Sequence, residues 1–271
     1  MNNQTKIRPV IKWSGSKRSQ AAEIVKLFPS FQKYYEPFIG GASVAYMAKP
    51  RNGICGDICV PLINLWNIIK LKPESLSLSY HEAWHRLQKA GHQVYYEIRD
   101  HFNQTQSPYD LFFLSRTCVN GLIRFNKNGE FNNSLHHTRK GIHPLTLNKI
   151  LLDWSARMKN IEFRTGDYRA TTMDITKHDF IYLDPPYFNT KGRYYGTIDY
   201  EEFLSYLEAL NSKGIKYALS FDGIREETDY TIDLPKELYK KHIMLEAGNS
   251  SFKKVMDKRT EKVCESLYLN W

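Results

Sequence analysis

The fold is indicated most directly by one short stretch, Phe180-Ile181-Tyr182-Leu183-Asp184-Pro185-Pro186-Tyr187. Four apolar or aromatic residues in a row are typical of a strand that is buried on both faces, as in a parallel sheet. The two prolines lack an N–H group and cannot continue the strand, so it ends next to Asp184. In open α/β sheets, ligands bind beyond the carboxyl ends of the strands. Asp184 is therefore expected in a binding site.

The residues after this strand suit a planar amine. The carboxylate of Asp184 can accept one hydrogen bond from an exocyclic amino group, and the carbonyl of Pro185 can accept a second. Two acceptors so placed draw the amino nitrogen out of conjugation with its ring and expose its lone pair. Pro186 keeps the turn rigid, and Tyr187 offers a ring on which a base stacks, an interaction worth roughly 1–3 kcal/mol. A rigid strand stop alone explains the prolines but not Asp184 and Tyr187.

Apolar stretches bounded by turn residues predict seven strands along the chain. Segments with helical spacing lie between them, and this alternation is typical of βαβ units in a Rossmann-like α/β fold with a parallel, doubly wound sheet. The strands are expected at residues 33–39, 53–58, 161–165, 180–183, 217–221, 241–245 and 262–269. The neighbouring helices are expected at residues 19–28, 42–48, 62–70 and 201–212.

The alternation stops between about residues 73 and 145. Helical spacing there predicts helices at residues 76–90, 94–102 and 111–118, the last begun by the Ser107-Pro108 pair. Asn128-Gly129, between two short apolar segments, predicts the turn of a β-hairpin with basic residues around it. We interpret residues 73–145 as a helical insert with a β-hairpin, mounted on the Rossmann-like domain.

Three further strand ends carry residues suited to a nucleoside. Gly40-Gly41 joins a strand to a helix and leaves backbone amides exposed for a carboxylate or phosphate, but without the G-x-G-x-x-G spacing of nicotinamide sites. Asp57 is placed to hold ribose hydroxyls, and Asp167 to accept from an adenine amine. Each acid alone is more typical of a helix cap or a turn. Together with Asp184 they predict a nucleoside pocket.

Composition supports an anionic partner. The 271 residues carry 38 Lys and Arg against 29 Asp and Glu, a net charge of +9, and the excess is concentrated at residues 1–33, 116–143 and 236–262. Clustered cations favour a polyanion, although solvated faces account equally well for the charge alone. Four scattered cysteines predict a reducing compartment and no metal site. With no signal peptide and no apolar stretch long enough to span a bilayer, the protein is expected in the cytoplasm, away from membranes.

The order of these motifs resembles the Dam-like DNA adenine N6-methyltransferases, which use S-adenosylmethionine, in the arrangement called the alpha type. The matching motifs are KWSGSK (12–17), EPFIGGAS (36–43), GD (56–57), GDY (166–168) and DPPY (184–187). The resemblance extends to residues 57–70, 119–132 and 261–271, and so covers nearly the whole chain. It implies a catalytic methyltransferase domain made of residues 1–72 and 146–271, and a target-recognition role for the insert, residues 73–145.

The resemblance also implies residue roles. Cofactor contacts are expected from Trp13, Gly15 and Lys17, closing over the ligand, from Glu36, Phe38, Gly40 and Gly41 on the methionine side, from Asp57 at the ribose, from Asp167 and Tyr168 at the adenine, and from Asp184. The catalytic residues that hold a flipped adenine would be Asp184, Pro185, Pro186 and Tyr187. Contacts with double-stranded DNA are expected from Lys12, Leu122, Arg124, Asn126, Lys127, Arg139, Lys191 and Arg193, of which Leu122 and Arg124 would read bases beside the target.

The sequence departs from the family pattern in three places. Ser16 follows Gly15 where two glycines are usual, and Ala42 replaces a glycine. Residues 132–139 lack the Val-Pro-aromatic-Gly-Arg-Tyr run found in members that methylate GATC, so a different recognition sequence is expected. Adenine as the target base is unaffected by this change.

Other functions remain open on the sequence alone. The same fold serves N4-cytosine and RNA adenine methyltransferases, which more often carry Ser or Asn in place of Asp184. A catalytically silent DNA-binding module is a further alternative, but it would have no need to keep Asp57, Asp167 and Asp184 together. The expected associations are with duplex DNA in the nucleoid and with a cognate restriction endonuclease, and the expected state is a monomer.

Overall fold

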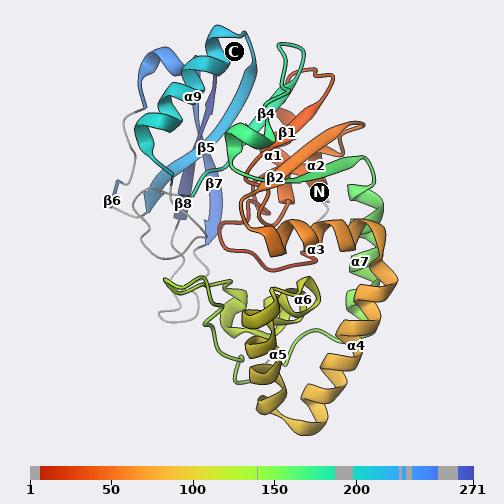
Figure 1. The fold of residues 1–271 in the computed structure, drawn as a ribbon. Coiled ribbons are helices and arrows are strands. Elements are labelled where there is room, and N and C mark those ends of the chain that lie inside the picture. Colours follow the sequence, from red (N-terminus) through yellow and green to blue (C-terminus); the bar gives the residue numbers. More distant parts are fainter. Residues whose placement is uncertain (1–6, 139, 187–197, 226–227, 230–233, 250–261) are drawn as a thin grey trace, which may run out of the picture.

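The computed structural model describes residues 7–138, 140–186, 198–225, 228–229, 234–249 and 262–271. A central sheet with helices on both faces occupies one end of the molecule, and a region of helices with one β-hairpin occupies the other (Figure 1). The helices are α1 (Ala21–Lys26), α2 (Ser43–Ala48), α3 (Val60–Leu71), α4 (Pro73–Ala90), α5 (His92–Thr105), α6 (Pro108–Thr117), α7 (Pro144–Met158), α8 (Tyr168–Thr171) and α9 (Tyr200–Ser212), with 3-10 turns η1 (Val119–Gly121) and η2 (Lys236–Leu238). The strands are β1 (Tyr34–Glu36), β2 (Gly53–Asp57), β3 (Ile161–Thr165), β4 (Phe180–Leu183), β5 (Lys216–Arg225), β6 (Thr228–Asp229), β7 (Lys241–Asn249) and β8 (Lys262–Leu269).

The sheet has the order β3-β2-β1-β4-β5-β8-β7, and the short β6 pairs with β5. Neighbouring strands from β3 to β5 are parallel, whereas β8 runs antiparallel between β5 and β7. In the parallel part, Glu36 pairs with Cys55, and Asp57 pairs with Thr165. This register brings the carboxyl ends of adjacent strands to one edge of the sheet.

The predicted α/β fold is confirmed. Each of the seven predicted strands is present, and β3, β4 and β8 begin and end at the predicted residues. The structure adds β6, α7 and α8, which the sequence analysis did not predict. It also corrects the expected sheet in one respect, because the strands at residues 241–249 and 262–269 join it through antiparallel pairing.

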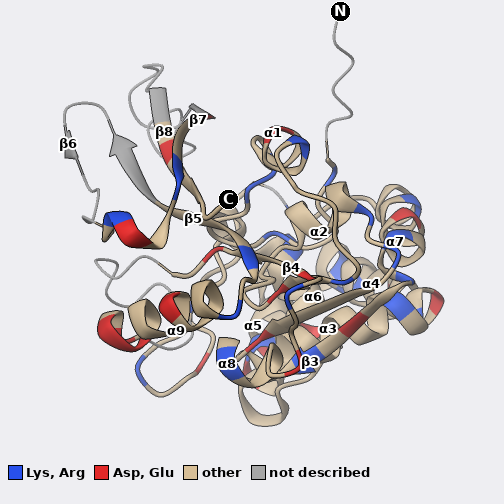
Figure 2. Cartoon of the chain, turned by 90° about the horizontal axis from the view of Figure 1, so that it is seen from above, with Lys and Arg blue, Asp and Glu red and all other residues tan. Residues whose placement is uncertain are grey.

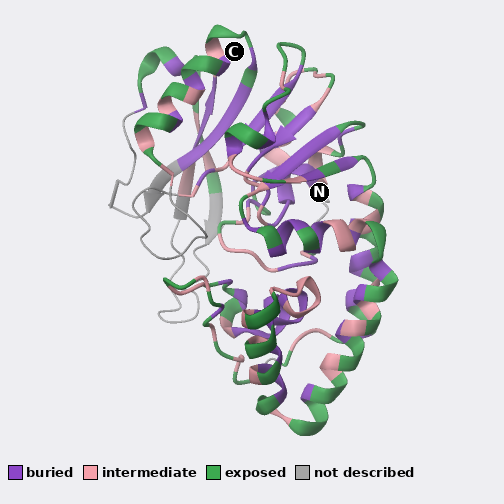
Figure 3. Cartoon of the chain, viewed as in Figure 1, coloured by how far each residue is buried: buried purple, intermediate pink, exposed green. Residues whose placement is uncertain are grey.

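Successive residues of the parallel strands enter two different cores. Tyr34 of β1 and Phe180 of β4 face the core that contains α1, α3 and α7, whereas Tyr35 and Ile181 face the core beneath α9. All four side chains are fully buried. Figure 3 shows the parallel strands buried and the outer faces of α4 and α5 exposed. Burial on both faces explains why these strands appear as continuous apolar segments in the sequence.

Proline begins several helices. Pro61, Pro73, Pro108 and Pro144 lie in the first turns of α3, α4, α6 and α7, where a missing N–H breaks no hydrogen bond. As predicted, Ser107 caps α6, its hydroxyl accepting a hydrogen bond from the backbone of Asp110. These local signals define the helices of the insert.

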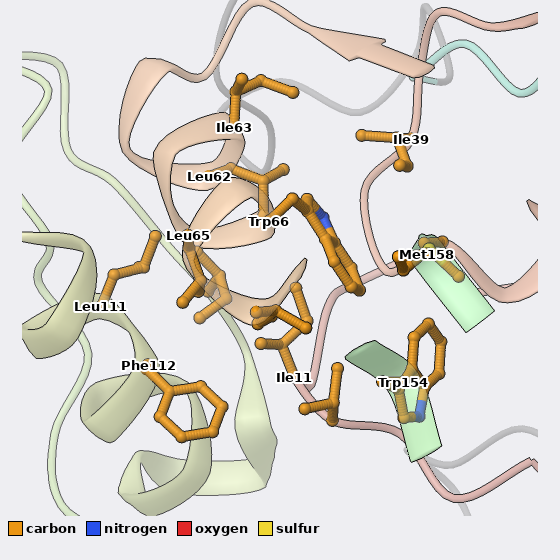
Figure 4. Close-up of a cluster of buried hydrophobic side chains, with 14 of the residues drawn as sticks. Ile11, Ile39, Leu62, Ile63, Leu65, Trp66, Leu111, Phe112, Trp154 and Met158 are labelled. Atoms are coloured by element: carbon orange, nitrogen blue, oxygen red, sulfur yellow. The ribbon is translucent and has the colours of Figure 1, made fainter. Parts of the chain in front are cut away.

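The insert and the sheet domain share one hydrophobic core. In Figure 4, Trp66 of α3 and Trp154 of α7 lie close to Ile11 from the N-terminal segment, with Leu111 and Phe112 of α6 on the opposite side. The centroids of the two indole rings are 5.5 Å apart. Because this core is continuous, the packing of the insert and that of the sheet domain depend on each other.

Residues 7–19, which we call the N-terminal strap, connect the insert to the sheet domain. The carbonyl of Arg8 accepts a hydrogen bond from Trp154 at 2.7 Å, and that of Pro9 accepts one from the buried Arg116 at 2.9 Å. Gly121 has φ +63°, and a Cβ atom there would lie 2.2 Å from Cδ of Lys12. The start of the hairpin therefore packs directly on the strap.

The predicted hairpin is present around Asn128-Gly129. Phe125 and Phe131 form an antiparallel bridge, and Gly129 takes the left-handed φ of +77° that its turn needs. The side chain of Asn126 is used inside this turn, because its oxygen accepts hydrogen bonds from Asn128 and Glu130. Among the described residues, no helix is both long and apolar enough to cross a membrane.

Trp66→Phe is expected to destabilise the protein more than Trp84→Phe. The Trp66 indole N–H donates to the Gly40 carbonyl at 3.0 Å, so its loss leaves a partly buried acceptor unpaired, at a cost of about 1 kcal/mol. Trp84 Nε1 is also buried but has no hydrogen-bond partner among the described residues. Urea unfolding of the two variants measures the difference, and equal losses of unfolding free energy would contradict this role of Trp66.

Candidate active site

A cavity of about 210 Å³ opens at the carboxyl ends of β1, β2, β3 and β4. The strap forms one wall, and the starts of α2, α8 and α9 form the others. Its lining residues are Trp13, Ser14, Gly15, Ser16, Lys17, Glu36, Phe38, Ile39, Gly40, Gly41, Ala42, Ser43, Val44, Asp57, Ile58, Asp167, Tyr168, Arg169, Asp184, Pro185, Pro186, Ile198, Asp199 and Glu202. The edge of the sheet predicted to bind a ligand therefore contains a cavity.

The turn between β1 and α2 needs glycine because the strap packs against it. Gly40 has φ +42°, and a Cβ atom there would lie 2.8 Å from the Trp13 ring. The next position in the left-handed region is Ala42, with φ 52°, at the start of α2. This is the position where the family usually has glycine, and the small side chain of alanine is accommodated there with some backbone strain.

Asp57 fixes the end of β2 next to this turn. One of its carboxylate oxygens accepts a hydrogen bond from the backbone of Gly40 at 3.3 Å, and the other accepts one from Cys59 at 3.0 Å. Burial raises the pKa of Asp57 to about 6, against the effect of these hydrogen bonds, which lower it. Asp57 thus holds the glycine turn and lines the cavity with a carboxylate.

Asp167 acts as the cap of α8. Its carboxylate accepts hydrogen bonds from the backbones of Arg169 and Ala170, at 2.9 and 2.8 Å, and lies 3.1 Å from the Arg169 guanidinium. Partial burial raises the pKa of Asp167, but the hydrogen bonds from Ala170 and Arg169 outweigh this effect, so the pKa lies below its usual value. Arg169 also contacts Glu202 of α9 at 3.1 Å. Figure 2 shows basic positions on α8 near acidic positions on α9.

Glu36 is a buried acid at the end of β1, only 3% exposed. Tyr34 donates a hydrogen bond to its carboxylate at 2.7 Å. Burial raises the pKa of Glu36 to about 8, the hydrogen bond from Tyr34 opposes this rise, and the nearby charge of Asp184 adds to it. A cation bound in the cavity would favour the ionised form of Glu36.

Asp184 is held by an ion pair with Lys17. The Lys17 ammonium lies 3.0 Å from Oδ1 of Asp184 and is almost completely buried. Burial raises the pKa of Asp184 to about 6, Lys17 lowers it, and the charge of Glu265 raises it further. Lys17 therefore contacts the predicted catalytic acid directly, and it is removed from the basic surface of the strap.

The structure brings together every described residue that was predicted to bind the cofactor or the target base. The set from Trp13 to Pro186 lines one cavity, whereas Tyr187 lies outside the described residues. Sequence reasoning missed several lining residues, chiefly Ser43, Arg169, Asp199 and Glu202. Asp199 could have been found from the sequence, because an acid directly before a helical segment is typical of a helix cap. In the structure Asp199 caps α9 by accepting a hydrogen bond from the backbone of Glu202.

The residues predicted to contact DNA are distributed differently. Leu122, Arg124 and Lys127 are exposed on the hairpin, and Lys12 lies half-buried on the strap beside it. Arg139, Lys191 and Arg193 lie outside the described residues. Among the residues that the structure places, no group of three or more His, Cys, Asp or Glu is arranged to hold a metal ion.

The sheet and the acidic cavity at its carboxyl edge are those of a Rossmann-like enzyme with room for a nucleoside-containing cofactor. A family model for D12 class N6 adenine-specific DNA methyltransferases matches residues 13–257. This chain belongs to that family. It therefore transfers a methyl group from S-adenosylmethionine to N6 of adenine in DNA, as the sequence motifs had predicted.

Individual relatives agree with this assignment. The type II methyltransferase M.MjaIII of Methanocaldococcus jannaschii is 26% identical over 312 residues, covering 98% of this chain and 99% of that protein. The DNA adenine methylase of Serratia marcescens is 31% identical over 186 residues, covering 67% of each chain. The modification methylase StsI of Streptococcus sanguinis is 28% identical, and the match covers 85% of this chain but 37% of that longer protein.

The stability of the ligand-free protein is expected to fall between about pH 6 and pH 8. Burial raises the pKa of Glu36 from its ordinary value of 4.5 to about 8, so the folded form binds this proton more tightly than the unfolded chain. The stabilisation is complete below about pH 4.5 and is lost as the pH rises through about 8, with a change on the order of 2 kcal/mol between pH 6 and 8. Asp57 and Asp184, with pKa values near 6, contribute mainly at lower pH.

Glu36→Gln should flatten this decline, and the exposed Glu208→Gln should leave it unchanged. The free energy of unfolding, measured by urea titration at several pH values, provides the comparison. An equally steep decline in Glu36→Gln would rule out Glu36 as its source.

Proposed function

We propose that the cavity binds S-adenosylmethionine next to a flipped adenine, and that Asp184 and the carbonyl of Pro185 accept hydrogen bonds from the N6 amino group. The observation that supports this most directly is the convergence of Glu36, Asp57, Asp167 and Asp184 on one cavity at the edge of the sheet. Rotating the adenine out of a duplex costs a few kcal/mol and is necessary because N6 is otherwise inside the base stack.

The lining residues fit the cofactor chemically. S-adenosylmethionine carries positive charge at its sulfonium and ammonium groups, and the cavity has carboxylates at Glu36, Asp57 and Asp184. Trp13 and Phe38 offer aromatic faces, and the Gly40-Gly41 turn leaves its backbone close to the cavity. We assign Glu36 and the glycine turn to the methionine part, Asp57 to the ribose, and Asp167 with Tyr168 to the adenine, with Trp13, Gly15 and Lys17 closing over the ligand.

The residues of this chain act on the target by binding and orientation. S-adenosylmethionine supplies an electrophilic methyl group. Asp184 is largely ionised above its pKa of about 6, so at neutral pH it accepts a hydrogen bond from N6 and favours exposure of the nitrogen lone pair. Pro185 is buried, which restricts the movement of its backbone, and its carbonyl would be the second acceptor. Pro186 lines the cavity and keeps the turn rigid. Tyr187, which lies outside the described residues, would stack on the adenine. Fixed geometry and preorganised charge provide the rate enhancement.

We assign target recognition to residues 73–145 and catalysis to residues 1–72 together with 146–271. The hairpin supports this division because Leu122 and Arg124 are exposed while Ile123, between them, is buried. A guanidinium can form two hydrogen bonds with guanine in the major groove. Because the run typical of GATC readers is absent, the proposed target is another sequence containing adenine. Arg139 would help to read that sequence, and Lys191 and Arg193 would clamp the target strand.

The protein is proposed to act as a monomer on duplex DNA, alongside a restriction endonuclease. A monomer is sufficient for this mechanism because one chain supplies the whole cavity lining. The relatives that are type II methyltransferases and modification methylases support a cognate restriction endonuclease that cleaves the unmethylated site. Binding to duplex DNA would place the enzyme on the nucleoid.

Asp184→Ala is expected to reduce methyl transfer to adenine by at least about 100-fold, because the N6 amine loses its charged acceptor. Tritium transfer from labelled S-adenosylmethionine to adenine-containing duplexes gives the rate. The exposed Glu208→Gln serves as a control and should have the rate of the native enzyme. Asp184→Ala with a near-native rate would show that Asp184 does not orient the amine.

Arg124→Ala and Lys127→Ala are expected to affect DNA binding in different ways. Loss of Arg124 should relax the preference for one base pair by about 1–3 kcal/mol, whereas loss of Lys127 should weaken binding to all sequences and lower its salt dependence. Expression of each variant in a methylation-free host, followed by modification-sensitive genome sequencing, gives the target site and its stringency. Unchanged stringency in Arg124→Ala would exclude base reading by this residue.

A further inference from the structure

Glu265 on β8 is not part of the cavity lining, but it contacts the residue that holds Asp184. The Lys17 ammonium lies 3.0 Å from Oε2 of Glu265 and 3.0 Å from Oδ1 of Asp184. The Lys17 side chain is 4% exposed, compared with 19% for Asp184 and 20% for Glu265. The ammonium is therefore enclosed between two carboxylates that come from different strands of the sheet.

The pairing of β8 with β5 and its pairing with β7 both shift in register near Glu265. Toward β5, Ser266 pairs with Phe221 but Glu265 pairs with Gly223, so β5 has one extra residue at this point. Toward β7, the register shifts between Glu246 and Gly248, just beyond the partner of Glu265. Bulges change the direction of side chains and are common next to active sites. The sheet is thus irregular at the level where Glu265 meets Lys17.

The charges around Asp184 explain why a second carboxylate matters. Lys17 and Glu265 face Asp184 from the strap and from β8, and the charge of Asp184 in turn raises the pKa of Glu36 on β1 and of Tyr182 on β4. Lysine has a flexible stem, so each carboxylate in contact with its ammonium narrows the positions that the ammonium can take along the Asp184 carboxylate. Glu265 supplies a second contact at ion-pair distance, an electrostatic one, because its buried Oε2 has no hydrogen-bond partner among the described residues. Within the described part of the chain, Oδ2 of Asp184 has no hydrogen-bond or ion-pair partner.

We propose that Glu265 is a positioning residue for methyl transfer: it holds Lys17 against Oδ1 of Asp184 and so keeps Oδ2 available to the N6 amino group of adenine. The inference rests on the role proposed above for Asp184. Glu265 itself contacts neither the adenine nor the cofactor in this arrangement. It acts through Lys17, and its removal should affect turnover rather than binding.

Glu265→Gln tests this role because it removes the charge and keeps the size of the side chain. The single-turnover rate of methyl transfer should fall by roughly 10- to 100-fold, with affinities for S-adenosylmethionine and DNA within about twofold of the native values. Since the charge of Glu265 raises the pKa of Asp184, the acid limb of the pH–rate profile should move to lower pH. The exposed Glu246→Gln on β7 removes the same charge and should change neither property. Thermal unfolding verifies that each variant is folded.

In a background without Lys17, the Glu265→Gln change is expected to alter the rate of methyl transfer in the opposite direction. In Lys17→Met, Asp184 and Glu265 face each other without a cation, and repulsion should displace Asp184. Adding Glu265→Gln to Lys17→Met should therefore increase the rate, although the same change decreases it in the native enzyme. An unshifted acid limb in Glu265→Gln, or a further decrease in the double variant, would overturn the inference. Retained activity in Asp184→Ala would overturn the proposed function instead, so the two failures are distinguishable.

Discussion

Several carboxylates and one lysine share a small, largely buried space at the edge of the sheet, and this concentration of negative charge is the constraint on which the site depends. Glu36, Asp57 and Asp184 each lose hydration there, and burial raises the pKa of each. Lys17 is the cation within ion-pair distance of Asp184. A site built in this way is poorly satisfied without a ligand and becomes favourable when a positively charged ligand enters. The same charges thus weaken the empty protein and select its cofactor.

The parallel strands bring these charges together, and the strap connects them to the insert. The strap contacts α7 and α6 through the carbonyls of Arg8 and Pro9, lies under the hairpin at Lys12, and then supplies Trp13 and Lys17 to the cavity. One short segment therefore touches the region assigned to DNA reading, the cofactor cavity and Asp184. Because the core beneath it is continuous, a displacement of the hairpin is opposed by the packing of Trp66 and Trp154.

The parallel part of the fold and most of the cavity could be predicted because their signals are local. Buried strands such as β4 are continuous apolar segments, and residues that end parallel strands meet at one edge. Helix α7 was not predicted, although its signals are local too: Pro144 stands in its first turn, and Leu147, Ile150, Leu151 and Trp154 have helical spacing. The place of β8 between β5 and β7 could not be predicted, because alternation in a strand does not specify its partners. For this reason Glu265, although inside a recognised motif, had no predicted role. Asn126 shows the opposite limit: its residue type suits DNA, but its side chain oxygen is used in the turn.

The position of β8 also has a consequence for biosynthesis. It is the last described strand in the sequence, yet it is inserted between β5 and β7 and carries the second carboxylate of the Lys17 pair. A nascent chain that has emerged from the ribosome only as far as β7 contains every residue that lines the cavity, but β5 and β7 still lack the strand that joins them. Completion of the sheet, and of the carboxylate pair around Lys17, therefore waits for residues 262–269 to leave the ribosome.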